Sequence, residues 1–100
     1  MRKRTGQVLA SGQDQHGISN SAAAKALGGA DVVYDPVGGD QFRAGLSALK
    51  FEGRILPIGF ASGDVPRIPA NIVLVKNVDV IGLSILSGAH LPLFTRVMAL

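Results

Sequence analysis

The chain has 100 residues, of which 47% are hydrophobic and 17% charged, with a formal net charge of +3. This length predicts a single domain, and the lack of cysteine excludes a disulfide framework and a thiolate metal site. Three of the ten basic residues lie in the first four positions, and the rest are scattered without the aromatic interleaving that suggests base stacking, so we expect no nucleic-acid partner. No apolar run reaches the ~18 residues of a membrane span, and no signal-peptide core follows the basic start. We therefore expect a cytoplasmic protein with no membrane partner.

The first part of the chain divides into a polar head and a helix. Residues 1–18 are polar and aperiodic, so we expect a disordered or non-native head there. Ser19–Leu27 is rich in alanine and is followed by two glycines, which predicts a helix that stops at Gly28.

A strand, a helix and a second strand are predicted next. Val32–Tyr34 is a short apolar run, typical of a strand buried on both faces. Asp40 is predicted to cap the following helix, which Gly53 is expected to end. The second strand is then expected at Ile55–Ile58, opened by Arg54. The apolar face of the helix is predicted to consist of Phe42, Leu46 and Leu49.

The remaining elements are predicted less uniquely. Periodicity allows either a helix or a strand at Asn71–Lys76, where the last lysine is expected to act as a cation at the helix C-terminus. Val78–Leu83 is apolar and is predicted to be a strand. We expect the domain to cover residues 19–86 and a truncated helical tail, beginning near Pro92, to cover residues 87–100.

Both central strands run into glycine at their carboxyl ends. The first leads into Val37-Gly38-Gly39 and the second into Gly59. In parallel α/β sheets ligands bind beyond the carboxyl ends of the strands, and glycine lets a ligand approach the backbone. A tight turn before a helix also favours glycine, so the pattern alone leaves both interpretations open.

Four segments in order resemble the cofactor-binding domain of the zinc-independent medium-chain dehydrogenase/reductases, most closely the NADPH:quinone oxidoreductases of the zeta-crystallin type. They are GADVVYDPVGG at 29–39, GRILPIGFASG at 53–63, IPANIVLVKN at 68–77 and VDVIGL at 78–83. The resemblance implies the second half of a Rossmann-type parallel sheet with flanking helices, incomplete in this chain.

The same resemblance implies a cofactor, a substrate class and a site. Such enzymes bind NADPH and reduce a quinone or an enone, and the chemistry is carried by the cofactor rather than by a catalytic residue of this stretch. With no cysteine and two histidines far apart, no metal site is expected. The residues expected to line the nicotinamide side of the cofactor site are Val37, Gly38, Gly39, Ile58, Gly59, Phe60, Leu83 and Ser84.

The departures from the family pattern lead to three further expectations. The chain contains no G-x-G-x-x-G phosphate-binding turn and no separate catalytic domain, so we expect a fragment that is inactive alone. In the resembled family the strand at Val78–Leu83 pairs with its copy, which implies a homodimer through an exposed sheet edge. Val32–Tyr34 is also expected to be exposed at the opposite edge. The alternative is a non-enzymatic α/β interaction module that associates through such an edge.

Overall fold

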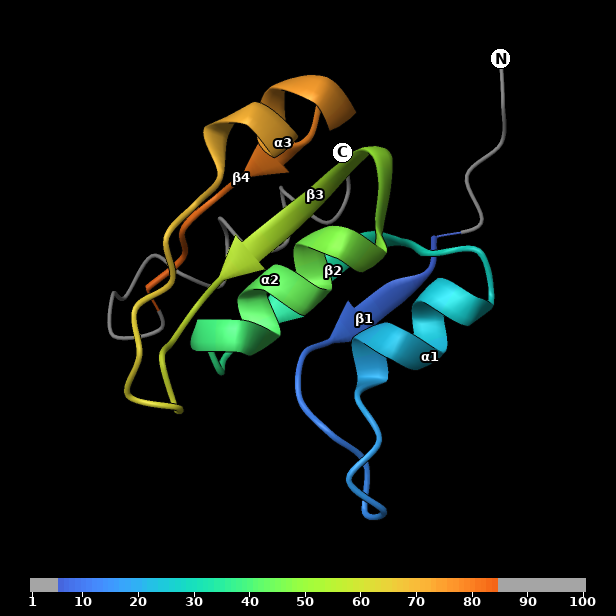
Figure 1. Ribbon diagram of the computed structural model, residues 1–100. Helices are drawn as coiled ribbons and strands as arrows, with labels where there is room; N and C mark the ends of the chain where they lie inside the picture. The colour runs from blue at the N-terminus through green and yellow to red at the C-terminus, as the bar shows by residue number, and fades with distance from the viewer. Residues whose placement is uncertain (1–5, 85–100) are drawn as a thin grey trace.

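A four-stranded parallel sheet with the order β1-β2-β3-β4 organises the computed structural model, which describes residues 6–84 (Figure 1). Its strands are β1 (Val8–Ala10), β2 (Ala30–Asp35), β3 (Leu49–Pro57) and β4 (Asp79–Val80), and its helices are α1 (Asn20–Ala26), α2 (Gly39–Ala48) and α3 (Ala70–Lys76). Strands and helices alternate along the chain, as in successive βαβ units. The predicted α/β fold with a parallel sheet and flanking helices is confirmed.

Helix α2 packs its apolar face on the two central strands. Phe42 and Leu46, four residues apart, are at most 2% exposed, as are Val33 of β2 and Ile55 of β3. Gly45 allows the close approach, because a Cβ there would lie 2.8 Å from Cγ1 of Val33. Helix α1 lies beside α2 over the same face (Figure 1). This packing holds α2 against the central strands.

Helix α2 begins earlier than predicted. Its N-cap is Gly38, with φ 77° and ψ −161°, and the expected cap residue Asp40 lies in the first turn. Asp35 accounts for the difference, because its Oδ1 accepts the amides of Val37 and Gly38 at 2.9 and 3.0 Å. The Asp35 carboxylate therefore stabilises the turn into α2, where the sequence predicted a cap at Asp40.

Strand β3 also begins earlier than predicted, at Leu49 rather than after Gly53. Its register with β2 shifts between Ala30 and Val32, and Glu52 adopts a φ of 66° at this irregularity. Gly53 lies inside the strand and does not end a helix; a Cβ there would come within 2.8 Å of the Asp31 carbonyl oxygen. Glycine at this position allows β3 to approach β2 closely.

The polar head is partly structured, which corrects the expectation of disorder over residues 1–18. Strand β1 pairs in parallel with β2, with Val8 opposite Val32 and Ala10 opposite Tyr34. Because β1 covers that side of β2, the expected exposure of Val32–Tyr34 at a sheet edge is wrong. The apolar run Val8–Ala10 is only three residues long, too short for periodicity to reveal it.

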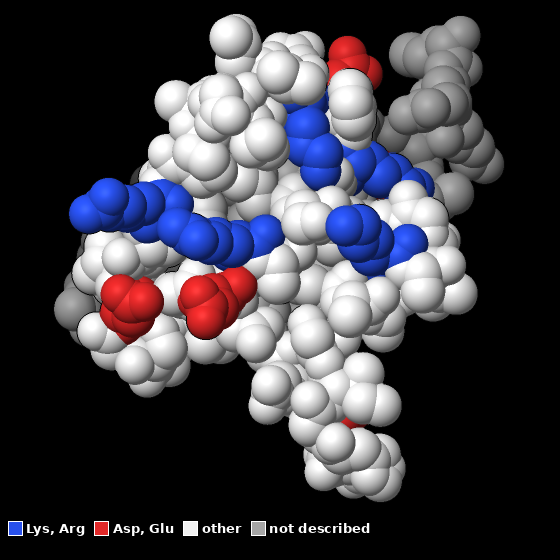
Figure 2. All heavy atoms as spheres, in the orientation of Figure 1, with Lys and Arg blue, Asp and Glu red and all other residues white. Residues whose placement is uncertain are grey.

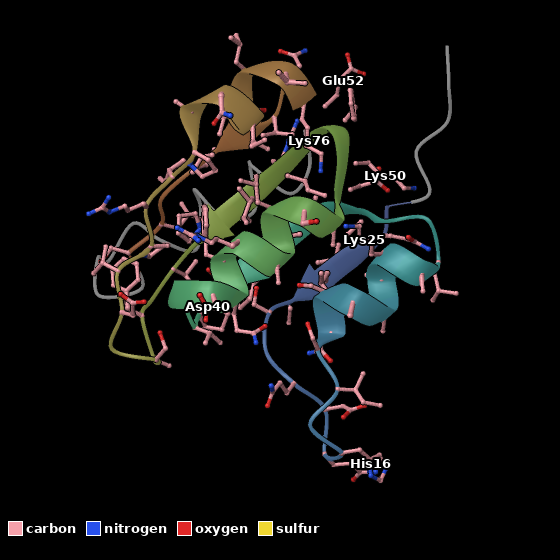
Figure 3. All side chains as sticks on the ribbon, in the orientation of Figure 1. His16, Lys25, Asp40, Lys50, Glu52 and Lys76 are labelled. Carbon is pink, nitrogen blue, oxygen red and sulfur yellow. The ribbon has the colours of Figure 1, made fainter. Side chains whose placement is uncertain are left out.

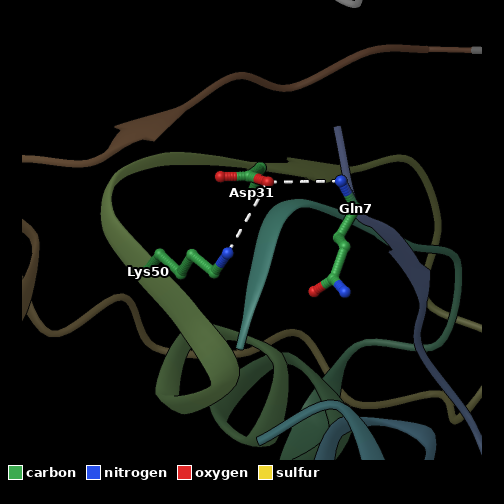
Figure 4. A network of polar contacts seen from close by, with 3 residues as sticks. All are labelled: Gln7, Asp31 and Lys50. Atoms are coloured by element: carbon green, nitrogen blue, oxygen red, sulfur yellow. Dashed lines mark hydrogen bonds and ion pairs between the residues drawn. The ribbon is translucent and has the colours of Figure 1, made fainter. Parts of the chain in front are cut away.

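A polar contact ties the amino ends of the strands together (Figure 4). Asp31 at the start of β2 accepts the Gln7 amide at 3.2 Å and faces Lys50 Nζ at 3.9 Å. Asp31 is buried, so both partners compensate its charge. This contact lies at the opposite end of β2 from Asp35 and so takes no part in the strand-end site described below.

The ambiguous segment at Asn71–Lys76 is a helix, α3. The strand predicted at Val78–Leu83 is shorter, Asp79–Val80, although the amides of Ile81 and Leu83 continue to donate to β3 carbonyls at 3.0 and 3.2 Å. Among the described strands β4 is outermost, as predicted. The predicted tail, residues 87–100, lies outside the described residues. No helix within residues 6–84 is long and apolar enough to cross a membrane.

Candidate functional site

Three chain segments meet at the carboxyl edge of the sheet. Val37–Gly39 follows β2, Ile58–Phe60 follows β3, and Leu83 with Ser84 follows β4. The amide of Ile58 donates to the Asp35 carbonyl at 2.9 Å, and that of Leu83 donates to the Pro57 carbonyl at 3.2 Å. The structure therefore brings together all eight residues that the sequence proposed for a site. We call this set the strand-end site.

The turn between β2 and α2 is held from within by a buried carboxylate. Asp35 is fully buried, and its Oδ1 binds the two turn amides described above. Its Oδ2 is buried without a hydrogen-bond partner in the described part of the chain. Both turn amides point into the protein and not toward a ligand.

A loop that follows β3 packs directly on this turn. The amides of Ala61 and Ser62 donate to the carbonyls of Pro36 and Val37 at 3.0 Å each. The Ser62 hydroxyl also donates to the Val37 carbonyl, at 2.7 Å. We call residues 60–64 the latch loop.

The latch loop also occupies the start of α2. The Gly39 amide donates to the Asp64 carbonyl at 2.9 Å, so this first amide of the helix is capped by the chain itself. A Cβ on Gly38 would lie 2.8 Å from the same oxygen and 3.0 Å from Phe60 Cδ1. The lack of side chains at Gly38 and Gly39 therefore allows the latch loop to pack against them. This favours a structural role of the two glycines over a role in ligand binding.

The surface left open at this edge is mainly apolar. Phe60 is 47% exposed, and Val37, Ile58 and Gly59 are half-buried beside it. Ser84 is exposed, whereas Leu83 is buried. Such a wall can support a flat apolar ring, but its backbone amides at the β2–α2 turn are already paired and cannot bind phosphate.

One neighbouring segment escaped the sequence-based interpretation. The loop between β1 and α1 reaches the same edge, where the Ser11 amide donates to the Tyr34 carbonyl at 2.9 Å. A Cβ on Gly12, whose φ is 127°, would lie 4.0 Å from Val37 Cγ2. The apolar triplet Val8–Ala10 followed by Ser-Gly could have indicated this loop. It does so only if the triplet is first interpreted as a strand.

Lys76 lies in the last turn of α3, as predicted for a cation at a helix C-terminus. Its Nζ also donates to the carbonyls of Leu46, Ser47 and Leu49 at 3.0, 3.2 and 2.6 Å, at the end of α2. Burial and, to a lesser extent, the positive charge of Lys25 lower the pKa of Lys76. Figure 3 shows Lys25 and Lys76 near this end of α2, with Asp40 at its other end. This distribution suits the helix dipole.

Metal ligands are scarce in the described part of the chain. Residues 6–84 hold no group of three or more His, Cys, Asp or Glu side chains that could bind a metal ion. The chain contains no cysteine. The described residues therefore do not fit a zinc ion, and none of them is assigned to one.

Comparison with known proteins places these features in context. The family model for zinc-binding dehydrogenases matches residues 5–99. The chain is 52% identical over 62 residues to quinone oxidoreductase-like protein 2 homolog from Nematostella vectensis. That match covers 62% of this chain and 16% of the relative, so the chain spans about one-sixth of the length of that curated protein.

Solved structures share the fold. A putative alcohol dehydrogenase from Sinorhizobium meliloti superposes with a TM-score of 0.60 at 30% identity, over 94% of this chain and 25% of that one. A mycobacterial protein solved in complex with NADPH gives a TM-score of 0.58 at 24% identity, over 79% of this chain and 27% of that one.

Proposed function

Because the chain belongs to the zinc-binding dehydrogenase family, within the quinone oxidoreductase-like medium-chain dehydrogenase/reductases, we propose that its strand-end site forms the nicotinamide side of an NADPH site. The parent enzyme would reduce a quinone or an enone, and the hundred-residue chain would be inactive alone. When bound, the cofactor supplies the hydride, and this chain supplies surface and position.

The observation that supports the proposal is the convergence of three strand ends on a half-open apolar wall. Phe60, Val37 and Ile58 lie there together although up to 23 residues separate them in sequence. A planar ring can stack on such side chains, and the turn held by Asp35 keeps Val37 in place. The wall orients a ring and excludes water from one of its faces.

The phosphates of a dinucleotide find no equivalent cradle in the described residues of this edge. The Gly39 amide is paired with Asp64, and those of Val37 and Gly38 are paired with Asp35. The sequence also has no G-x-G-x-x-G turn. We therefore propose that phosphate binding in the parent enzyme depends on other residues.

Two halves of the cofactor test this division. Reduced nicotinamide mononucleotide and adenosine 2′,5′-bisphosphate would each be titrated into the ¹⁵N-labelled chain, with backbone amide shifts as the readout. We expect the nicotinamide compound to shift the amides of Val37, Gly59 and Phe60, and the adenosine compound to leave them unchanged.

Matched variants sharpen the test. Phe60→Ala removes a half-exposed side chain of the wall, whereas Leu74→Ala removes an exposed side chain on α3, away from it. Phe60→Ala should weaken binding of the nicotinamide compound roughly tenfold, about 1.4 kcal/mol at an aromatic contact, and Leu74→Ala should leave it unchanged. Shifts confined to other elements, or equal effects of the two variants, would refute the proposal.

We also propose self-association through β4, the sheet edge that the alternative function would use. In the described sheet β4 is outermost, and Val80 and Ile81 on this edge are only half-buried. Its backbone offers donors and acceptors to a second strand. A chain that dimerises here yet fails to bind either half of the cofactor would favour the interaction module over the enzyme.

A further inference from the structure

A hollow in the described surface lies between α2 and α3, away from the strand-end site. It has a volume of about 470 Å³, within the ~300–1,000 Å³ typical of ligand pockets. Its apolar lining consists of Leu46, Ile68, Pro69 and Ile72. We call this hollow the α2–α3 groove.

Two arginines line the α2–α3 groove without a charge partner among the described residues. Arg43 projects from α2 and Arg67 from the loop before α3, and both are exposed. Neither forms an ion pair or a hydrogen bond within residues 6–84, in contrast to Lys50 and Arg54, which face carboxylates at 3.9 Å. Figure 2 shows basic side chains spread across this face, with fewer acidic ones. Two guanidinium groups are therefore available to an anion.

The third cation of the α2–α3 groove is already engaged. Lys76 donates to three carbonyls at the end of α2, as described above. Because α2 and α3 both follow strands of one parallel sheet, they run in the same direction, with Arg67 before the start of α3 and Lys76 at its end. The charge offered to a ligand is thus concentrated toward Arg43 and Arg67, and apolar side chains line the remaining length.

We propose that the α2–α3 groove binds a small amphipathic carboxylate: an anionic head on Arg43 and Arg67 and an apolar body along Ile68 and Ile72. Guanidinium groups match carboxylates in a bidentate geometry, and apolar walls of this size bury an alkyl or aryl body. The proposal is independent of the cofactor site, because the two sites share no lining residue.

Octanoate is the probe, and octanol is its uncharged counterpart of equal chain length. Each would be titrated into the ¹⁵N-labelled 100-residue chain. We expect octanoate to shift amides of α2, α3 and residues 67–69 in a saturable manner, and octanol to bind at least about tenfold more weakly. Reduced nicotinamide mononucleotide should not displace octanoate.

Variants locate the head and the body of the ligand. Arg43→Gln with Arg67→Gln should abolish the preference for octanoate over octanol, and Ile72→Asp should weaken both ligands. The matched control Lys50→Gln removes one positive charge outside the groove and should leave both affinities unchanged. Equal binding of octanoate and octanol to the unmodified chain would overturn the proposal. Amide shifts centred outside the α2–α3 groove would also overturn the proposal. So would shifts in the groove that appear when the chain concentration is raised without ligand, because they would show that a second copy of the chain binds there.

Discussion

Replacing Lys76 with methionine should destabilise the fold by about 2 kcal/mol. Lys76→Met keeps the length and apolar stem of the side chain and removes the donor that binds the carbonyls of Leu46, Ser47 and Leu49. The bond to Ser47 is exposed, and water can replace it. The other two are partly buried, and hydrogen bonds to a charged group contribute about 1.5–3 kcal/mol each. The desolvation of the ammonium group, which also lowers the pKa of Lys76, offsets part of that sum.

Urea denaturation and thermal unfolding, each followed by far-UV circular dichroism, measure the free energy of unfolding and the melting temperature. For a domain of this size each kcal/mol lowers the melting temperature by about 4–8 °C, so a decrease of about 8–16 °C is expected. The matched control is Lys25→Met, which removes one exposed bond to the Ser47 hydroxyl and should cost less than about 0.5 kcal/mol. Equal losses for the two variants would refute the idea that Lys76 joins α3 to α2.

Three further outcomes are expected. The pKa of Lys76 is lower in the folded chain, so between that pKa and the ordinary value of about 10.4 the unfolded chain binds more protons. The stability of the unmodified chain relative to Lys76→Met should therefore rise with pH through this window, as measured by urea titrations at pH 7 and 10. An equal stability difference between the two chains at both pH values would contradict this expectation. Val80→Lys should weaken self-association by bringing like charges together at β4, which light scattering over a range of concentrations would detect; an unchanged mass would count against that edge. The purified chain should oxidise NADPH with a quinone no faster than a heat-killed control, and measurable turnover would disprove its inactivity alone.

The sequence predicted the central βαβ unit because its signals are local. Apolar runs predicted β2 and β3, and the spacing of Phe42 and Leu46 predicted the buried face of α2. Parallel topology then placed the glycines of both strand ends at one edge. Element boundaries failed where a distant contact decides them: Asp35 forms the turn into α2, and a register shift extends β3 through Gly53.

Other features of the site depend on contacts between residues far apart in sequence. Lys76 lies 27 to 30 positions from the carbonyls that it binds, and Ser62 lies 25 from Val37. No periodicity encodes such pairs. Strand β1 was missed for a different reason, since three residues carry too little pattern to distinguish a strand from a polar head. The sequence identified Gly38 and Gly39 as site residues but did not predict that the latch loop packs against them.

What Gly38 contacts can be tested with three glycine-to-alanine substitutions. Gly38→Ala combines a φ of 77° with a Cβ placed 2.8 Å from the Asp64 carbonyl oxygen. Gly63→Ala has a similar φ of 81° but meets no described atom within 4 Å, and Gly82→Ala meets none and has no positive φ. The series separates the cost of the backbone conformation from the cost of the contact.

Conformation alone should cost Gly63→Ala about 1–2 kcal/mol, and Gly82→Ala should stay within about 0.5 kcal/mol of the unmodified chain. Gly38→Ala should lose at least about 2 kcal/mol more than Gly63→Ala, because the Asp64 oxygen is backbone and the hydrogen bond from Gly39 holds it in place. Urea denaturation gives the three values, and amide exchange at Gly39 reports whether the latch loop has detached. If Gly38→Ala and Gly63→Ala cost the same and exchange at Gly39 is unchanged, the latch loop does not need this glycine. The space beside Gly38 would then be available to a ligand, and the structural interpretation of the Gly38-Gly39 pair would fail.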